Sequence, residues 1–231
     1  MVEQRTGASG TIGTEYVAKS APDGYTLALG SMATLCVVPH LYAKIGYDPV
    51  RDFAPVTMLT ASPFVIDVHP SIPARTIKEL IALAKANPGK LTFGTAGAGS
   101  VSHLGVEMLK SMAGVNFLHI PYKGVAPAMI SLLGGETALM YDPVLTSLPH
   151  AKAGRIRVLA VGSSTRTPLL PELPTVAEAG VPGYEASSWF GIVAPAATPR
   201  EVITRLHATL VKTIGDKDVS QRLQSQGMEP V

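Results

Sequence analysis

The stretch Leu91-Thr-Phe-Gly-Thr-Ala-Gly-Ala-Gly-Ser-Val-Ser-His103 carries the clearest local signal in the chain, a short strand followed by a loop of small residues and the start of a helix. Strand-like and helix-like segments alternate along the remaining chain, and this alternation favours an α/β fold over a β-sandwich or a helix bundle. The expected strands are short, rich in β-branched or aromatic residues, and mostly bounded by turn residues. They are Tyr25–Leu29, Phe64–Val68, Leu91–Gly94, Asn116–Ile120, Thr137–Tyr141, Ile156–Val161 and Trp189–Ala194.

Threonine followed three residues later by glutamate predicts three helix starts. In Thr76-Ile-Lys-Glu79, the hydroxyl and the carboxylate can satisfy N–H groups that the first helical turn leaves unpaired. Thr198-Pro-Arg-Glu201 repeats this capping box, and Thr175-Val-Ala-Glu178 is a shorter copy that ends at Gly180. The stripe expected to be buried after the second box consists of Val202, Ile203, Leu206 and Leu210. Two further helices are expected at Leu104–Met112 and Ala126–Leu133.

Composition excludes several classes of protein. The chain has 231 residues, of which 46% are hydrophobic and 16% charged, so it is too apolar for a disordered protein. Its 22 glycines and 19 prolines exclude a long coiled coil. The net charge is only +2 and the basic residues are spread evenly, whereas a nucleic-acid surface needs a concentrated basic patch. We therefore expect no nucleic-acid partner.

The cysteine content, the hydropathy and the first residues of the sequence indicate which cellular compartment to expect. The single cysteine, Cys36, excludes an internal disulfide framework and is expected to be a small buried hydrophobic residue. No run of residues approaches the ~18 apolar residues of a membrane span. The opening MVEQRTGASG lacks a basic segment followed by an apolar one. From these residues we expect a soluble chain that has no export signal of its own and stays cytoplasmic when expressed as written.

The loop from Thr95 to Ser102 is a candidate anion site. Backbone N–H groups in such a loop can remain unpaired at the positive end of the helix dipole, where they can hold a carboxylate or a phosphate. Thr95, Ser100 and Ser102 add hydroxyl groups. The glycine spacing matches neither G-x-G-x-x-G nor a nucleotide-binding P-loop, so we expect no nucleotide cofactor. The alternative is an ordinary strand-to-helix turn with serine as the N-cap.

Two further positions follow expected strands. The segment Leu29-Gly-Ser-Met-Ala-Thr34 is a second small-residue loop of the same type, and two such loops suit a small anionic ligand in a cleft. Asp142 ends the apolar strand Thr137–Tyr141 and precedes Pro143. Its carboxylate would orient a ligand amine, a ligand hydroxyl or an ordered water, or else Asp142 starts an Asp-Pro turn.

Some of the same residues also allow a catalytic interpretation. Ser100 or Ser102, with His103 and Asp142, would supply the groups of a serine hydrolase. However, no G-x-S-x-G elbow occurs, and the favoured interpretation of His103 is a polar residue in the first turn of a helix. None of the six histidines has the spacing of a metal site, so no metal is expected.

Taken together, the segments resemble the substrate-binding proteins of tripartite tricarboxylate transporters, the TctC or Bug family. The matching pieces keep their order along nearly the whole chain, and their order and spacing together are specific although no single piece is. They are Arg5–Gly13, Ala21–Leu27, Tyr47–Pro55, Gly94–Ser100, Ser102–Leu104, Pro121–Gly124, Tyr141–Pro143, Leu173–Gly180, Pro182–Tyr184 and Ala194–Pro199.

The resemblance implies a periplasmic two-lobe binding protein that closes over a small carboxylate, with the cleft between its lobes. Residues 1–90 and 191–231 would form the first lobe and residues 91–190 the second, with Leu91–Gly94 and Thr137–Tyr141 as strands of the same lobe. The ligand would be a di- or tricarboxylate, an acidic amino acid or an aromatic acid, delivered to the membrane components of the transporter. The resemblance implies no catalysis and no cofactor.

The same resemblance assigns the ligand to loops that follow strands, with ordered waters taking part. The ligand-binding positions implied in this chain are Ser31, Thr34, Thr95, Gly97, Ala98, Gly99, Ser100, Ser102 and Asp142.

The chain departs from the family pattern at both ends. Family members begin with a signal peptide, a strand and a ligand loop before the segment that matches Val2–Gly13, and they continue past Val231 into a last helix. The expectation is therefore an incomplete first lobe with an open sheet edge. Because an open edge invites pairing with another chain, we also expect self-association through this lobe.

Overall fold

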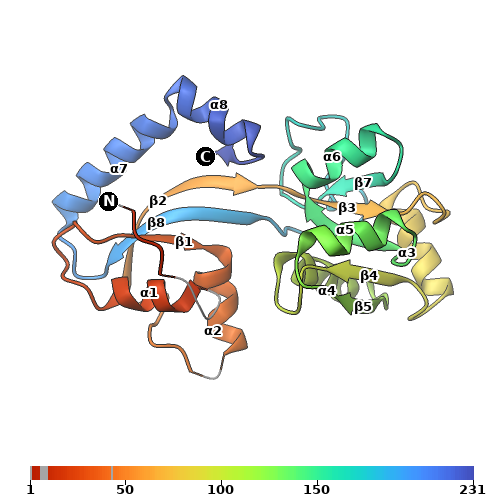
Figure 1. Ribbon diagram of the computed structural model, residues 1–231, viewed down its shortest axis with the longest axis horizontal. Coiled ribbons are helices and arrows are strands. Elements are labelled where there is room, and N and C mark those ends of the chain that lie inside the picture. The colour runs from red at the N-terminus through yellow and green to blue at the C-terminus, as the bar shows by residue number, and fades with distance from the viewer. Residues whose placement is uncertain (1, 6–9, 43) are drawn as a thin grey trace. The chain divides into compact units, whose positions relative to one another are not determined.

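The structure is a computed structural model that describes residues 2–5, 10–42 and 44–231 (Figure 1). The chain has a mixed α/β fold and divides into two compact units. Unit 1 comprises Met1–Ala61 and Ser188–Val231, and unit 2 comprises Ser62–Ser187. Four residues of the Arg5–Gly13 motif, residues 6–9, lie outside the described part of the chain. Within the described residues, no helix is both long enough and apolar enough to span a membrane.

Unit 1 is built on a four-stranded sheet with the order β1-β8-β2-β9. Residues Val17, Tyr47, Phe53 and Val193 are buried in its small core. Its strands are β1 (Ala28–Ser31), β2 (Phe53–Ser62), β8 (Ser188–Pro195) and β9 (Glu229–Pro230). Its helices are α1 (Thr11–Ala18), the π-helix η2 (Ala33–Val37), α2 (Val38–Leu41), α7 (Arg200–Ile214) and α8 (Lys217–Ser225).

Unit 2 is built on a five-stranded sheet with the order β5-β4-β6-β3-β7. Its strands are β3 (Phe64–Val68), β4 (Thr92–Thr95), β5 (Leu118–Pro121), β6 (Leu139–Pro143) and β7 (Arg157–Val161). Strand β4 runs parallel to β5 and β6, whereas β3 is antiparallel to β6 and β7. The expectation that Leu91–Gly94 and Thr137–Tyr141 contribute strands to the same lobe is therefore confirmed, because β4 and β6 are neighbours in this sheet.

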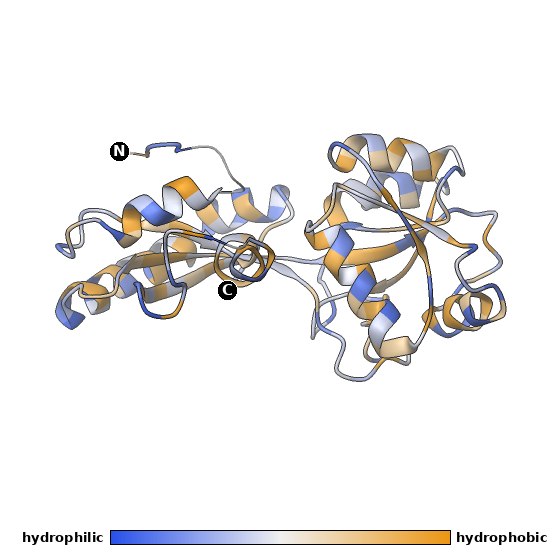
Figure 2. Cartoon of the chain, turned by 90° about the horizontal axis from the view of Figure 1, so that it is seen from below, coloured by the Kyte–Doolittle hydropathy of each residue, from blue (hydrophilic) through white to orange (hydrophobic). Residues whose placement is uncertain are grey.

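Helices cover both faces of this sheet, and this arrangement explains why all five residues of β3 are buried. Helices α3 (Ile77–Ala86) and α4 (Val101–Ala113) pack on the face that carries Ile66 and Tyr141. Helices α5 (Val125–Leu133) and α6 (Val144–Lys152) contact strands from the face that carries Val65 and Met140. Figure 2 shows hydrophobic residues concentrated on the strands, with mixed colouring on the helices.

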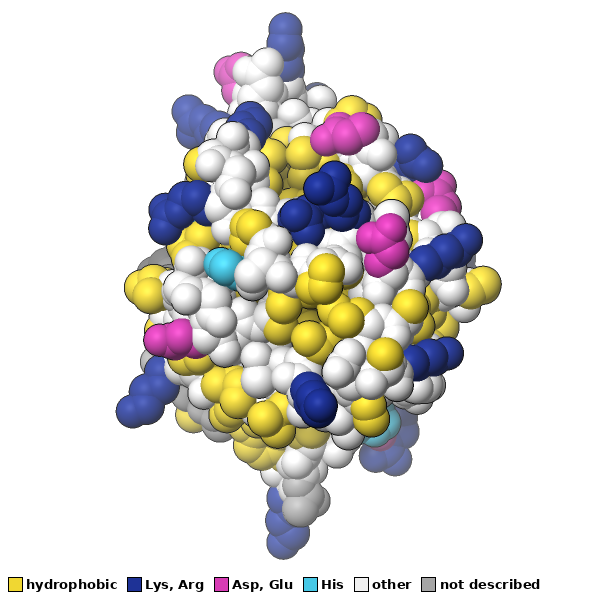
Figure 3. All heavy atoms as spheres, turned by 90° about the vertical axis from the view of Figure 1, so that its right-hand side faces the viewer, with side chains coloured by type: hydrophobic (Ala, Val, Ile, Leu, Met, Phe, Trp, Pro, Cys, Tyr) yellow, Lys and Arg dark blue, Asp and Glu magenta, His cyan; other side chains and the backbone are white. Residues whose placement is uncertain are grey.

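Charged side chains of both signs lie on one face of the molecule (Figure 3). On the face shown in Figure 3, lysine and arginine side chains are dispersed among hydrophobic and acidic ones and form no continuous basic patch. This surface agrees with the even spread of basic residues along the sequence.

The lobe boundary differs from the expected one. Residues 62–90 were expected in the first lobe from the family resemblance, whereas their contacts group them with unit 2. The reason is that β3 pairs with β6 and β7 in the second sheet, so the chain changes units next to Ser62. On the return, it changes at Ser188, close to the expected residue 191.

Several local expectations need correction. Thr175 and Glu178 do exchange the hydrogen bonds of a capping box, at 2.9 and 3.0 Å, but only a turn follows before Gly180, whose φ is +123°. The Thr198 hydroxyl donates to the carbonyl of Pro195 and does not cap α7. The α7 stripe is half-buried, and Cys36 is exposed because it lies on an outward face of η2.

Candidate functional site

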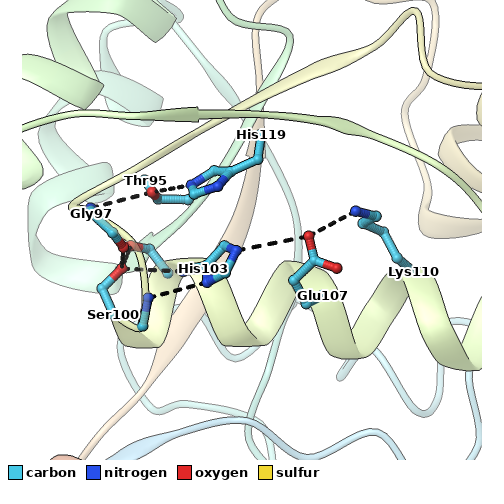
Figure 4. A network of polar contacts seen from close by, with 9 residues as sticks. Thr95, Gly97, Ser100, His103, Glu107, Lys110 and His119 are labelled. Carbon is cyan, nitrogen blue, oxygen red and sulfur yellow. Dashed lines mark hydrogen bonds and ion pairs between the residues drawn. The ribbon is translucent and has the colours of Figure 1, made fainter. Parts of the chain in front are cut away.

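The strongest candidate site is the loop that joins β4 to α4 in unit 2 (Figure 4). Strand β4 ends at Thr95 and α4 begins at Val101, so the sequence pattern of strand, loop and helix is confirmed. Gly97 and Gly99 have φ values of +128° and +78°, which residues with a Cβ rarely adopt. The small residues of this stretch are therefore needed for the path of the loop.

The loop is held together by its own hydroxyl groups. The Ser100 hydroxyl caps α4 by accepting from the His103 N–H at 3.3 Å, and it donates to the Gly97 carbonyl at 2.6 Å. The Ser102 hydroxyl lies 2.8 Å from that of Ser100 and accepts from the Ala96 N–H at 3.0 Å. Ser102 is only 2% exposed. These hydroxyls are thus engaged in fixing the backbone.

Several backbone N–H groups of the loop remain free. Among the described residues, no protein acceptor pairs with the N–H of Ala98, Val101 or Ser102. Val101 and Ser102 begin α4, where the helix dipole favours a negative charge, and Ala98 is exposed. Together they form a set of donors suited to a carboxylate or another small anion.

Two stacked histidines support the loop from β5 and α4. The rings of His103 and His119 lie 4.2 Å apart between centroids, and His119 also stacks on Phe93 at 4.8 Å. The Gly99 N–H donates to Nδ1 of His103 at 3.2 Å. Nε2 of His119 lies 2.7 Å from the Thr95 hydroxyl oxygen, which accepts from the Gly97 N–H at 3.2 Å. Each ring is therefore bonded to a group that shapes the loop.

The electrostatics around His119 favour a neutral ring. Burial lowers the pKa of His119, and the neighbouring His103 lowers it further. Glu107 has the opposite effect; its carboxylate lies 3.9 Å from Nε2 of His103 and 2.7 Å from the ammonium of Lys110. His119 could not be recognised as a site residue from sequence, because nothing in its local sequence shows that β5 pairs with β4.

The second expected loop lies in unit 1, at the end of β1. The side chains of Ser31 and Thr34 pair mainly with each other, since each hydroxyl accepts from the other residue's N–H, at 3.1 and 3.2 Å. The Tyr47 hydroxyl donates to the Thr34 carbonyl at 2.6 Å. Thr34 also lines a cavity of about 610 Å³ within unit 1. Arg5 lines the same cavity and is paired with Glu3 at 3.0 Å.

Asp142 lies at the end of β6 and is completely buried. Neither of its carboxylate oxygens has a hydrogen-bond partner in the described part of the chain. Burial raises the pKa of Asp142 to about 7, and nearby hydroxyls of Thr146 and Ser147 oppose the rise. On the same face of the sheet, the buried carboxylate of Asp67 accepts from the Ser147 hydroxyl, and burial raises its pKa well above the usual value.

The residues weighed for hydrolysis do not form a triad. His103 bonds to the Gly99 N–H and faces Glu107, and among the described residues no hydrogen bond joins its ring to a serine hydroxyl or to Asp142. A serine hydrolase requires such a chain of hydrogen bonds. Within the described residues there is also no group of three or more histidine, cysteine or acidic side chains that could hold a metal.

Comparisons with known proteins agree with the resemblance read from the sequence. Residues 1–231 match the sequence model of the tripartite tricarboxylate transporter family receptor, TctC. BugT of Bordetella pertussis is 38% identical over 232 residues, which cover 100% of this chain and 71% of that protein.

Solved structures show the same fold. A structure of an R. palustris protein with adipate has a TM-score of 0.79 and 41% identity, covering 98% of this chain and 76% of that one. MatC from Rhodopseudomonas palustris, with bound malate, has a TM-score of 0.74 and 31% identity, covering 96% and 76%.

Proposed function

Because this chain belongs to the tripartite tricarboxylate transporter receptor family, we propose that it binds a small organic carboxylate and delivers it to the membrane components of such a transporter. The observation that carries the proposal is the set of free N–H groups at Ala98, Val101 and Ser102, beside the N-terminus of α4. A buried carboxylate needs several such donors, since an unpaired charge removed from water is costly. We also propose that it works in the periplasm; the support is that two similar solved structures are described as a periplasmic transporter and as the periplasmic binding protein BugD.

The proposed ligand class is a di- or tricarboxylate, an acidic amino acid or an aromatic acid. Its support is the adipate and malate of two similar structures. These two acids share carboxylate groups on a short chain, which suits a site that recognises mainly the carboxylate. One carboxylate would accept from the N–H groups of the loop, each charge-assisted bond contributing about 1.5–3 kcal/mol.

The candidate residues take different roles in this proposal. Ala98, Val101 and Ser102 contact the ligand through their N–H groups, while the hydroxyls of Thr95, Ser100 and Ser102 hold the loop. Gly97 and Gly99 supply the backbone conformation. Ser31 and Thr34 in unit 1, and Asp142 in unit 2, remain proposed ligand positions on the strength of the family resemblance.

Isothermal titration calorimetry with adipate, malate, citrate, glutamate and terephthalate tests the proposal. We expect at least one of them to bind without turnover, and Gly97→Ala to weaken that ligand at least tenfold. The matched control is Gly114→Ala at the other end of α4, because Gly114 also has a positive φ, +63°, and open space around it. It shares a positive φ with Gly97 but lies outside the loop. Binding of none of the five, or equal affinity in both variants, would refute the proposal.

A further inference from the structure

The contacts of the two histidines assign a proton to each ring. Nδ1 of His103 accepts from the Gly99 N–H, so the proton of the neutral ring lies on Nε2. The Thr95 hydroxyl is buried, and among the described residues the one acceptor within hydrogen-bond distance of its hydrogen is Nε2 of His119. The hydroxyl therefore donates to Nε2, and the proton of the neutral His119 ring lies on Nδ1. Each neutral ring therefore acts as an acceptor toward the loop.

Protonation would remove both acceptors. A protonated His103 carries a hydrogen on Nδ1 that points at the Gly99 N–H, and a donor facing a donor repels. A protonated His119 leaves the buried Thr95 hydroxyl without an acceptor for its hydrogen, which costs about as much as any buried unsatisfied group. In both cases the contact that breaks is one that sets the position of Gly97 or Gly99.

We propose that His103 and His119 are positioning residues, which hold the Thr95–Ser102 loop in its anion-binding form only while both rings are neutral. Carboxylate affinity consequently falls when the solution is acidified. This inference rests on the function proposed above. The expected direction of the change in affinity distinguishes this role from a purely electrostatic one. An imidazolium that acted through its charge alone would attract the anion and raise its affinity in acid.

The groups that face the pair come from three elements. Strand β4 contributes Phe93, which stacks on both rings, and the Thr95 hydroxyl. Strand β5 contributes His119 itself. Helix α4 contributes His103 with Glu107 and Lys110, and the acid and the base are paired with each other at 2.7 Å. Glu107 is thus partly neutralised, which leaves the loop contacts to govern the response to pH.

Two conservative substitutions keep a hydrogen-bond acceptor in place of each ring nitrogen but cannot take up a proton. In His103→Asn, the amide oxygen stands where Nδ1 stood and can accept from Gly99 at every pH. In His119→Gln, the amide oxygen reaches the place of Nε2. His103→Leu and His119→Leu provide no acceptor. His69→Asn is the matched control, since His69 is half-buried in unit 2 and its ring bonds to Ser71 rather than to the loop.

The experiment is calorimetric titration of the folded full chain with malate and with adipate at pH 7.5 and pH 5.5. Wild type and the His69 variant should lose about fivefold or more in affinity at pH 5.5. The double variant His103→Asn, His119→Gln should bind at pH 7.5 and keep its affinity within twofold at pH 5.5. The two leucine variants should bind weakly at both values. Protonation of the ligand's own carboxylates between the two pH values changes the affinity of every protein by the same factor, so it does not affect the comparison between variants.

Each outcome bears on one proposal. If malate and adipate bind wild type but the double variant shows the same pH ratio, the inference is overturned. If neither acid binds wild type at pH 7.5, the proposed function is contradicted for malate and adipate. The inference is then judged by the amide resonances of Gly97 and Gly99 in nuclear magnetic resonance spectra. They should titrate with the imidazoles in wild type and not in the double variant; invariant resonances would refute it.

Discussion

Replacing Asp142 by asparagine should change how the stability of the protein depends on pH. Asp142 is completely buried, and neither carboxylate oxygen has a hydrogen-bond partner in the described part of the chain. Burial raises its pKa from 3.8 to about 7. The native state therefore holds a proton that the unfolded chain releases. The stability this proton contributes is fully present below pH 3.8 and is lost as the pH rises through 7.

The size of the effect follows from the two pKa values. Because a tenfold change in proton affinity corresponds to about 1.4 kcal/mol, the whole loss from low to high pH is about 4 kcal/mol. Between pH 5 and pH 8 the expected part of that loss is about 2.5 kcal/mol. Asparagine does not titrate, so Asp142→Asn should gain about that much relative to wild type between these two pH values.

Urea unfolding followed by far-ultraviolet circular dichroism measures the difference. The free energy of unfolding is obtained for wild type and Asp142→Asn at pH 5 and pH 8, so that any fixed cost of the buried amide cancels. Asp218→Asn is the control, because Asp218 is exposed, and it should follow wild type. If Asp142→Asn and wild type lose the same stability between the two pH values, Asp142 is ionised in the native state and the reasoning fails.

Three further substitutions test the packing and the helix capping of unit 2. Gly105→Ala places a Cβ against the ring of Tyr141, so thermal unfolding should show a loss of about 1–3 kcal/mol; a smaller loss would mean that the ring moves freely. Thr76→Ala removes the hydroxyl that accepts from the Glu79 N–H and should cost about 1 kcal/mol by urea unfolding, with an unchanged midpoint contradicting the cap. Tyr184→Phe removes the hydroxyl that donates to the Gly105 carbonyl at 3.0 Å, and it should lower the free energy of unfolding by about 1 kcal/mol in the same assay. An unchanged free energy of unfolding would mean that this hydrogen bond does not stabilise the folded protein.

Elements whose signals are local could be predicted from sequence. Strand β3 has the expected bounds, Phe64–Val68, because four of its five residues are apolar. The exception is Asp67, which is also buried. The cap of α3 at Thr76 was expected because it depends on residues three apart. Strand β2 was missed since Pro55 and polar residues interrupt its pattern, and part of its pairing comes from Glu229 and Pro230, far along the chain.

Only part of the candidate loop could likewise be predicted from the local sequence. Its strand, its small residues and the serine cap of α4 are all readable in residues 91–103. Which donors remain free is not readable there. The hydroxyls of Thr95 and Ser102 were expected to point toward a ligand, yet they turn inward and bond within the loop or to His119. The backbone N–H groups are left as the donors.

Sequence alone was sufficient for the succession of strands and helices, for the α/β class and for the family motifs, because these depend on neighbouring residues and on their order. The burial of Asp142 and the stacking of His103 on His119 emerged only in three dimensions. Both depend on which strands become neighbours: the parallel pairing of β4 with β5 brings His119 to the loop, and the helices over both faces of the sheet exclude water from Asp142. Contacts between residues so far apart in the chain leave no local pattern, since their energy is gained only after the sheet has formed.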